Sequence, residues 1–229
     1  MELSNRLKTV AMMVDKCHCA ADIGTDHGYV PIYLIKNNIC ETAVACDINK
    51  GPLHKAQINI NSYNLKDKIE CRLGNGLNKL KPGEVQGIII AGMGGNLIRD
   101  ILEQGLEVFK NANFVVLQPV QNPEILREYI YKKGYKILDE NLCIDENKFY
   151  EIIKIVYDNK PKIVDEIFYE VSKKLIDINH PDIKKFILAK INRYKTILEN
   201  IKDTSDLALE RKHEIKNKIR KLEEILICL

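Results

Sequence analysis

The sequence predicts an α/β protein with a parallel sheet that closes in an antiparallel hairpin, followed by a C-terminal α-helical hairpin. Three observations support this fold class. Short β-branched runs alternate with helical patterns up to Gly134, which is typical of βαβ units. Two strand-like runs then follow each other with four residues between them. Beyond Lys160-Pro161, apolar residues recur at helical spacing.

The short apolar runs predict the parallel strands. Ile88–Ala91 is apolar throughout, which favours a central strand buried on both faces. A helix begins near Tyr29, where Pro31 fits the first turn because its missing N–H has no intrahelical partner there. Another helix opens at Pro123 and stops at Gly134. The predicted strands are 20–23, 42–46, 69–73, 88–91 and 114–117, and the other helices run through 56–60 and over 97–109.

The hairpin that closes the sheet is predicted from Tyr135–Ile144 and Phe149–Tyr157. No helix fits into the link between them, so the two strands must be antiparallel. Five βα repeats that end in such a hairpin are typical of Rossmann-like class I methyltransferases. An ordinary dinucleotide-binding fold would continue with further βα units.

The C-terminal part is predicted to be two helices that resemble a coiled-coil hairpin. The residues Asp203-Thr204-Ser205-Asp206 favour N-caps and predict a break, the alternative being one long helix. Residues 160–229 carry 16 Lys and Arg against 12 Asp and Glu, a balance of +4, which favours a polyanionic partner. The two apolar stripes consist of Ile183, Ile187, Ile191, Tyr194, Leu198 and Ile201, and of Leu207, Ala208, Ile215, Ile219, Leu222, Leu226 and Leu229.

The amino-acid composition is typical of a globular protein. With 45% hydrophobic and 29% charged residues, the chain has a globular balance, and disorder is not expected. Its seven scattered cysteines form no CxxC pair and predict reduced thiols in a cytoplasmic protein. Cys17-His18-Cys19 fits no zinc spacing, so we expect no metal. The start is not typical of a signal peptide, and no apolar run has membrane-spanning length.

A glycine turn follows the first predicted strand, with the pattern D-x-G-x-x-x-G from Asp22 to Gly28. Gly24 permits positive φ and a close backbone approach to a ligand. The carboxylates of Asp22 and Asp26 would repel a pyrophosphate but suit the ammonium group of a methionine moiety. This favours S-adenosylmethionine over NAD, with Asp22, Gly24 and Thr25 at the cofactor. The alternative role of Asp22 is a helix cap.

Three further strand ends supply candidate cofactor contacts. Asp47, followed by Ile48, lies where an acidic residue binds ribose hydroxyls in Rossmann-type folds. Asn75-Gly76 follows the third strand, where an amide and a bare backbone can contact adenine. The turn Gly92-Met93-Gly94 needs close backbone approach and lacks the Asn/Asp-Pro-Pro-aromatic motif of many exocyclic-amine methyltransferases. The alternatives are an exposed turn aspartate, a plain Asn-Gly turn and a glycine-rich turn into a helix.

Together these residues resemble the bacterial tRNA (adenine-22-N1)-methyltransferase family. The matching stretches are 3–7 (LSNRL), 21–31 (ADIGTDHGYVP), 90–95 (IAGMGG), 117–119 (LQP) and 122–127 (NPEILR). The resemblance implies methyl transfer from S-adenosylmethionine to N1 of adenosine 22, in the D arm of tRNA. It implies a catalytic domain over residues 1–160 and a tRNA-binding extension over 161–229. Neither a membrane nor an obligatory protein partner is indicated.

The resemblance also suggests roles on the substrate side. Adenine N1 has a free lone pair, so the enzyme mainly aligns the reactants and extrudes the base from its stack. Tyr29 is the candidate stacking face, and Asp26 and His27 are candidates to orient the exocyclic amine or take up a proton. Simple helix packing by Tyr29 and turn capping by His27 are the alternatives. The remaining substrate-side candidates are Arg6, Gln118, Pro119 and Asn122.

Three other functions compete with this hypothesis. A methyltransferase of the same fold could act on another RNA, a small molecule or a protein, although a lysine-rich helical hairpin is unexpected there. A nicotinamide-dependent oxidoreductase is disfavoured by the acidic glycine turn and the terminal hairpin. A non-catalytic RNA-binding protein would have no use for an intact cofactor site.

Overall fold

The structure, a computed structural model, describes residues 2–229, and the chain divides into two compact units, Met1–Ile163 and Val164–Leu229. No helix of the described residues has the length and apolar character that a membrane crossing requires.

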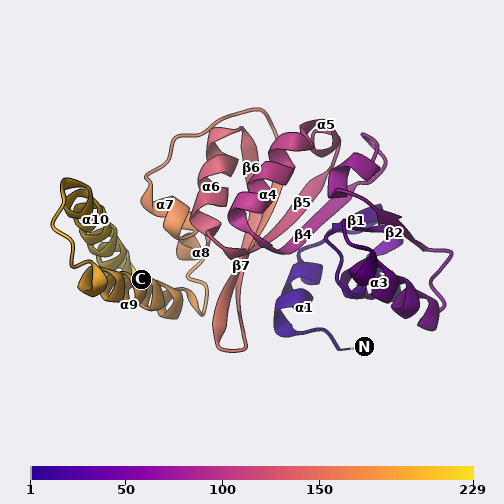
Figure 1. Ribbon diagram of the computed structural model, residues 1–229, viewed down its shortest axis with the longest axis horizontal. Coiled ribbons are helices and arrows are strands. Elements are labelled where there is room, and N and C mark those ends of the chain that lie inside the picture. The colour runs from indigo at the N-terminus through magenta and orange to yellow at the C-terminus, as the bar shows by residue number, and fades with distance from the viewer. Residues whose placement is uncertain (1) are drawn as a thin grey trace. The chain divides into compact units, whose positions relative to one another are not determined.

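The first unit is built on a seven-stranded sheet with the strand order β3-β2-β1-β4-β5-β7-β6 (Figure 1). Its first five strands are parallel, whereas β7 is antiparallel to both β5 and β6. The predicted fold, a parallel sheet that closes in an antiparallel hairpin, is therefore confirmed. The strands are β1 (Cys17–Ile23), β2 (Cys40–Asp47), β3 (Ile69–Leu73), β4 (Gly87–Gly94), β5 (Phe114–Gln121), β6 (Tyr135–Asp145) and β7 (Lys148–Tyr157).

Helices cover both faces of this sheet, and the central strand β4 shows why. Ile88, Ile89 and Ile90 are fully buried, and successive side chains of a strand point to opposite faces. Ile88 and Ile90 belong to the core under α4, α5 and α6, and Ile89 belongs to the core under α1, α2 and α3. The helices are α1 (Asn5–Met12), α2 (Tyr29–Lys36), α3 (Lys50–Ser62), the 3₁₀ helix η1 (Gly76–Lys79), α4 (Gly95–Gln104), α5 (Leu106–Phe109) and α6 (Pro123–Lys132).

Two features of this unit differ from the sequence-based expectation. The helix expected over 97–109 consists of two helices, α4 and α5, on either side of Gly105. A side chain at Gly105 would meet Cδ1 of Leu77 at 2.1 Å, so the glycine allows η1 to pack closely there. The second feature is α1, which was not predicted; Ser4 caps it by accepting a hydrogen bond from the Leu7 N–H at 3.4 Å.

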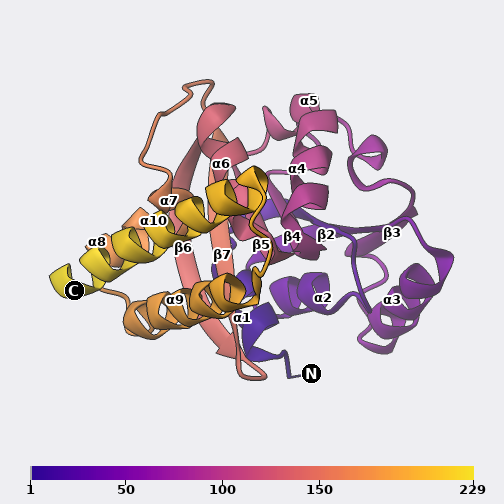
Figure 2. The same cartoon turned by 60° about the vertical axis from the view of Figure 1, so that its left-hand side comes forward.

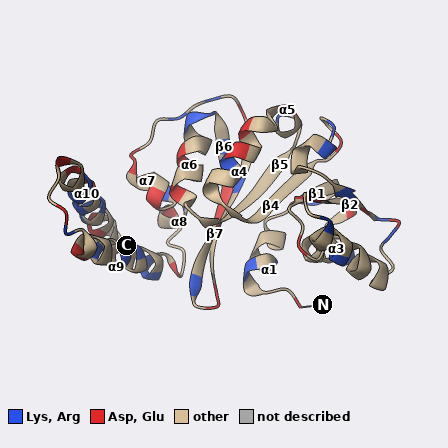
Figure 3. Cartoon of the chain, viewed as in Figure 1, with Lys and Arg blue, Asp and Glu red and all other residues tan. Residues whose placement is uncertain are grey.

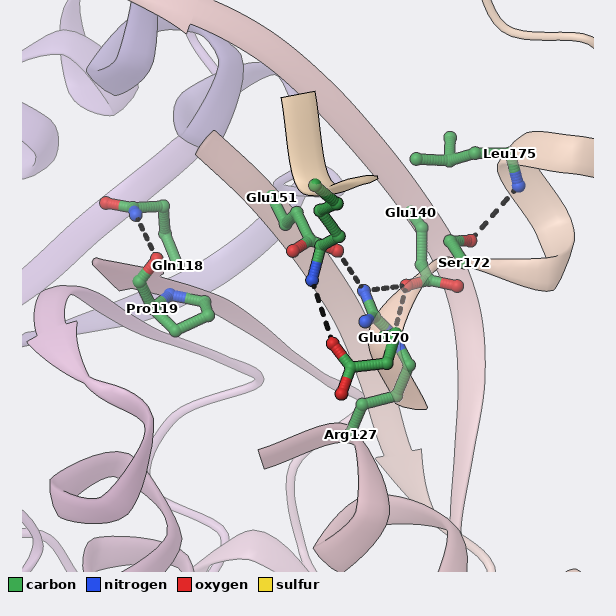
Figure 4. A network of polar contacts seen from close by, with 9 residues as sticks. Gln118, Pro119, Arg127, Glu140, Glu151, Glu170, Ser172 and Leu175 are labelled. Atoms are coloured by element: carbon green, nitrogen blue, oxygen red, sulfur yellow. Dashed lines mark hydrogen bonds and ion pairs between the residues drawn. The ribbon is translucent and has the colours of Figure 1, made fainter. Parts of the chain in front are cut away.

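A buried charge network joins α6 to the terminal hairpin (Figure 4). The guanidinium of Arg127 donates to Glu140 of β6 at 2.9 Å and to Glu151 of β7 at 2.6 Å, and all three residues are buried. Burial opposes the charged form of Arg127, but the carboxylates of Glu151 and Glu140 outweigh it and raise its pKa. The hairpin is therefore held to α6 by ionic hydrogen bonds as well as by apolar packing.

The second unit contains α7 (Ile167–Glu170), α8 (Lys173–Asp177), α9 (Ile183–Asn200) and α10 (Asp206–Cys228). Helices α9 and α10 pack against each other, as the predicted helical hairpin requires. The break falls at residues 201–205, where Ser205 caps α10 by accepting from the Ala208 N–H. The alternative of one long helix is therefore wrong. The buried residues of the two stripes are Ile183, Ile187 and Ile191 on α9, and Ile215, Ile219 and Leu222 on α10.

Glu170 is the polar centre of this unit. Its buried carboxylate accepts from the Tyr194 hydroxyl at 2.5 Å, from Lys218 Nζ at 2.6 Å and from Lys190 Nζ at 3.3 Å. Burial alone would raise the pKa of Glu170, but Lys190, Lys218 and Tyr194 together hold it at about 2. Two lysines of the basic tail are thus used inside the unit and pair with its own carboxylate.

Candidate cofactor and substrate site

A cavity of about 490 Å³ lies at the carboxyl ends of β1 and β4. This is the sheet edge at which open α/β sheets bind ligands, and β1 is where the strand order reverses. The cavity is lined by Ser4, Arg6, Leu7, Asp22, Gly24, Asp26, Tyr29, Val30, Ala91, Gly92, Met93, Asp145, Glu146 and Tyr150. Seven of the predicted site residues are therefore brought together: Arg6, Asp22, Gly24, Asp26, Tyr29, Gly92 and Met93.

The turn after β1 has the geometry that the glycine pattern predicts. Gly24 has φ +73°, and a Cβ there would lie 2.1 Å from Cε of Met93, so any side chain would push into the β4 turn. Asp22 is 6% exposed at the end of β1. Burial raises the pKa of Asp22 to about 6, and the nearby carboxylates of Asp47 and Asp26 add to the effect. A cation placed in the cavity would relieve this cost.

The turn after β4 is held from the side by Gln118 of β5. The Oε1 atom of Gln118 accepts from Arg6 Nη1 at 2.7 Å and from the Gly92 N–H at 3.2 Å, and its Nε2 donates to the Pro119 carbonyl at 2.8 Å. Gln118 is fully buried (Figure 4). Its amide is thus engaged with protein groups at both ends, and its contact with the substrate stays a prediction.

Asp26, His27 and Tyr29 form a small cluster at the start of α2. His27 has φ +59°, which brings its Nε2 to 3.4 Å from Oδ1 of Asp26. The rings of His27 and Tyr29 are stacked, with centroids 5.1 Å apart and planes 8° from parallel. Asn59 of α3 donates to the His27 carbonyl at 2.8 Å and holds the turn. Tyr29 lines the cavity, and its ring is braced by the imidazole of His27.

The candidates for ribose and adenine lie farther along the same edge, at β2 and β3. Oδ1 of Asp47 accepts from the Asn49 N–H at 2.6 Å, and Ile48 is exposed beside it. Gly76 has φ +26°, and a Cβ there would lie 2.6 Å from Cγ2 of Ile23 at the end of β1. Asn75 is exposed in the same turn. None of these four residues lines the 490 Å³ cavity.

Four other candidates lie near the cavity without lining it. Thr25 is buried, and its N–H donates to the Cys46 carbonyl at 2.8 Å. Pro119 is buried beside Met93, where the β4–β5 register shifts. Gly94 is the N-cap of α4. Asn122, with φ +51°, caps α6, and its carbonyl oxygen would lie 2.2 Å from a Cβ on Gly95.

One wall of the cavity was missed from the sequence. Ser4 and Leu7 come from the start of α1, whereas Asp145, Glu146 and Tyr150 come from the tip of the hairpin. Figures 1 and 2 both show α1 beside that tip. The signal for α1 was present in the N-cap Ser4, but nothing local in the sequence indicates that residues 4–7 and 145–150 meet.

A larger cavity, of about 640 Å³, lies at the opposite edge of the sheet and is lined in part by Cys17 and Cys40. Burial raises the pKa of Cys17 to about 11 and that of Cys40 to about 12, so both thiols are protonated and unreactive at neutral pH. His18 lies between Cys17 and Cys19 in β1, so it points to the other face of the strand, where its Nδ1 pairs with Glu41 at 3.0 Å. Residues 2–229 contain no group of three His, Cys, Asp or Glu side chains that could hold a metal.

Comparison with known proteins relates this site to methyltransferases. A family model described as a methyltransferase domain matches residues 3–153. The tRNA (adenine(22)-N(1))-methyltransferase of Bacillus subtilis is 38% identical over 153 residues, which cover 67% of this chain and 64% of that protein. The match therefore spans somewhat less than two thirds of the relative's own length.

Solved structures extend the similarity over nearly the whole chain. Streptococcus pneumoniae Sp1610, a putative tRNA (m1A22) methyltransferase in complex with S-adenosyl-L-methionine, superimposes with a TM-score of 0.83 at 30% identity, covering 98% of this chain and 100% of that one. M. capricolum TrmK in complex with S-adenosyl-homocysteine gives a TM-score of 0.85 at 29% identity, covering 99% and 100%. Both similarities include the helical unit as well as the sheet.

Proposed function

Because this chain belongs to the TrmK-like family of tRNA (adenine(22)-N(1))-methyltransferases, we propose that it transfers a methyl group from S-adenosylmethionine to N1 of adenosine 22 in the D arm of tRNA. The observation that carries the proposal is the cavity at the β1–β4 edge. It combines a buried carboxylate, two glycine turns with positive φ at Gly24 and Gly92, and an aromatic side chain.

The residues present fit S-adenosylmethionine. Asp22 is a buried carboxylate with a raised pKa and is therefore stabilised by an ammonium group. Gly24 leaves open the space that a side chain would fill against Met93. We assign the methionine part to Asp22, Gly24 and Thr25, the ribose to Asp47 and Ile48, the adenine to Asn75 and Gly76, and the methyl end to the turn Gly92, Met93 and Gly94.

When bound, this cofactor supplies an electrophilic methyl group on a positively charged sulfur. Adenine N1 attacks with its own lone pair, so no residue has to remove a proton first. The chain's contribution is alignment, through the fixed turns around Gly24 and Gly92. The methylated base then carries a positive charge, and the carboxylates of Asp26, Asp145 and Glu146 at the cavity favour a cation there.

The target base must leave its stack, because N1 lies on the pairing edge of adenine. Tyr29 lines the cavity and is braced by His27, which makes it a rigid surface for a base to stack on. Asp26 lines the cavity and lies 3.4 Å from His27, which supports a role in orienting the exocyclic amine. We assign Asp26, His27 and Tyr29 to the reacting base, and Arg6, Gln118, Pro119 and Asn122 to its surroundings.

The helical unit supplies a surface for the tRNA backbone. In Figure 3, Lys and Arg positions are coloured along α9 and α10, together with Asp and Glu positions. Lys190 and Lys218 are committed to Glu170, but Lys184, Arg193 and Lys216 are exposed. Phosphate contacts of this kind position a nucleic acid without reading its sequence. We therefore propose that residues 161–229 are a tRNA-binding extension.

The function is tested by mapping the methylated nucleoside. The full-length protein is incubated with S-adenosylmethionine and an unmodified tRNA transcript, and the product is digested and analysed by mass spectrometry. We expect 1-methyladenosine at position 22 and none in a transcript that carries G22. Methylation at another position, of another nucleoside, or only of a protein or small molecule would contradict the proposal.

A further inference from the structure

The cavity extends farther than the cofactor requires. The proposed ribose and adenine contacts lie at the ends of β2 and β3, on one side of β1 in the sheet order. The cavity itself reaches the other way, past β4 to Arg6 on α1 and Tyr150 on β7. A cofactor that runs from β1 toward β3 leaves this side of the cavity for the methyl acceptor.

Arg6 and Tyr150 form a fixed pair on that side. The guanidinium carbon of Arg6 lies 5.6 Å from the centre of the Tyr150 ring. Its Nη1 donates to Gln118, and its backbone N–H donates to Asp145 at 3.2 Å. Asn5 donates to the Ile144 carbonyl at 2.8 Å and ties α1 to the same hairpin tip. The pair is held in place from α1, β5 and the hairpin, and such support is what rigid recognition of a planar ligand requires.

Two side-chain pairs are therefore found beside the cavity, one of stacked rings and one of a cation over a ring. His27 and Tyr29 are parallel within 8° at the start of α2, and Arg6 lies over Tyr150 at the hairpin. Aromatic rings and arginine planes are both surfaces on which extruded bases stack. An adenine that points its N1 edge at β1 and β4 has two flat ring faces. Each ring face is shielded from water when it stacks on a side chain, so two stacking surfaces are expected.

We propose that Tyr150, positioned by Arg6, is the second stacking surface for the extruded adenine, opposite Tyr29. The inference rests on the proposed function, since it names the residue that receives that reaction's substrate. The acidic neighbours Asp145 and Glu146 offset the charge of Arg6 when the base becomes a cation. Tyr150 thus belongs to the substrate, and the affinity for the cofactor does not depend on it.

The test compares Tyr150→Leu with Tyr150→Phe in the full-length protein. Loss of one base–aromatic stack lowers kcat/KM for tRNA roughly 5- to 150-fold in the Leu variant, and the Phe variant stays within about threefold of the parent. Cofactor affinity, measured by calorimetry, stays unchanged in both. A Phe variant as impaired as the Leu variant, or equal losses in cofactor and tRNA affinity, would overturn the assignment.

Tyr63→Leu is the matched control. Tyr63 also carries a cation over its ring, Lys36 at 4.5 Å, and it is also half-buried, but it lies outside the cavity. We expect this variant to methylate tRNA like the parent. A loss equal to that of Tyr150→Leu would show that removing any such pair harms the protein, and the inference would fall.

A binding cycle separates the base contact from general damage. The parent and Tyr150→Leu are each titrated with tRNA that has A22 and with tRNA that has an abasic site at position 22. We expect the variant to bind the A22 tRNA more weakly and the abasic tRNA as the parent does. Equal weakening on both tRNAs overturns the inference while the proposed function stands. If the parent protein does not methylate A22, both the proposed function and this inference are refuted.

Discussion

At the scale of single residues, Asp22 of the proposed cofactor site is buried at a cost in stability. Its carboxylate is buried at the end of β1, and its pKa is raised to about 6. A carboxyl group whose pKa is raised by folding destabilises the folded state once it ionises, and the effect grows between the unfolded and folded pKa values. A cationic ligand reverses this, because it interacts with the ionised form alone.

Cofactor affinity should therefore depend on pH. Above pH 6, Asp22 is ionised and ready for the ammonium group. Below pH 6, it must release a proton on binding, so the affinity for S-adenosylmethionine should fall, by up to about tenfold per pH unit. Calorimetry between pH 5 and pH 8, in buffers of different ionisation enthalpy, measures both the affinity and the proton released.

Asp22→Asn is the control for this prediction. It should bind the cofactor roughly 10- to 150-fold more weakly at pH 7.5, because a charge-assisted hydrogen bond is removed, and its affinity should no longer change around pH 6. Without cofactor it should resist urea better than the parent, by up to about 3 kcal/mol above pH 6, with the gain shrinking toward pH 4. A parent affinity that is flat from pH 5 to pH 8 would refute the role of Asp22.

Gln118 shows the limit of sequence reasoning at this scale. Asp22, Gly24 and Gly92 were predicted from strand ends and glycine turns, because both are local signals. The orientation of a buried amide is not local: Gln118 donates and accepts toward Pro119, Arg6 and Gly92, and these partners are fixed only by the packing of β4, β5 and α1. The sequence could place Gln118 at the site but could not assign its partners.

At the scale of elements, the hairpin β6–β7 does more than close the sheet. Its tip supplies the cavity wall, and its middle holds the buried carboxylates Glu140 and Glu151 around Arg127 of α6. The element order and the antiparallel ending were predictable from hydrophobic periodicity and link length. The contact of α1 with the hairpin tip and the ionic tie were not, because each depends on residues far apart in the chain.

Arg127→Met should destabilise the protein strongly, by about 3–5 kcal/mol, since it leaves two carboxylates buried together without their cation. Urea unfolding monitored by circular dichroism measures the decrease. Adding Glu140→Gln and Glu151→Gln to the variant should recover much of the stability.

The matched control is Lys132→Met on the same helix. Lys132 pairs with Glu128 at 2.6 Å, but both side chains are largely exposed, at 62% and 41%. An exposed pair one helical turn apart contributes about 0.3–0.5 kcal/mol, so this variant should unfold almost like the parent. Similar destabilisation of the two variants would show that burial is not the reason for the effect.

At the scale of the whole molecule, positive charge is in excess in the part of the chain that begins at Lys160. The balance of +4 from Lys160 to Leu229 was readable from the sequence, as were the two helices that carry it. The structure adds that Glu170 and Asp165 draw Lys190, Lys218 and Lys221 into ion pairs within the helical unit. The count of basic residues alone therefore overstates the charge presented to a polyanion.

A chain that ends at Ile163 should keep its cofactor affinity and bind tRNA more weakly, because the proposed phosphate-binding surface is removed with the helical unit. The slope of log affinity against log salt should become shallower, by about 0.7–0.9 for each phosphate that the protein no longer neutralises. Filter binding at several salt concentrations measures the tRNA affinity and this slope.

The double variant Lys184→Ala, Arg193→Ala tests the same surface in the full-length chain. Both residues are exposed on α9, so folding should be unaffected, and the salt slope should fall by about two at most.

If the chain that ends at Ile163 folds, binds cofactor and methylates tRNA as well as the full chain does, the helical unit does not serve tRNA binding.

The contact between α1 and the hairpin tip has a consequence for the timing of biosynthesis. Arg6 and its partner Asp145 are separated by 139 residues, so this wall joins two segments that are synthesised at different times. At about 5–20 residues per second, roughly 7–28 s pass between the synthesis of Arg6 and that of Asp145. During that interval the nascent polypeptide exposes α1 without its docking site, and this wall of the cavity is complete only after the hairpin has been synthesised.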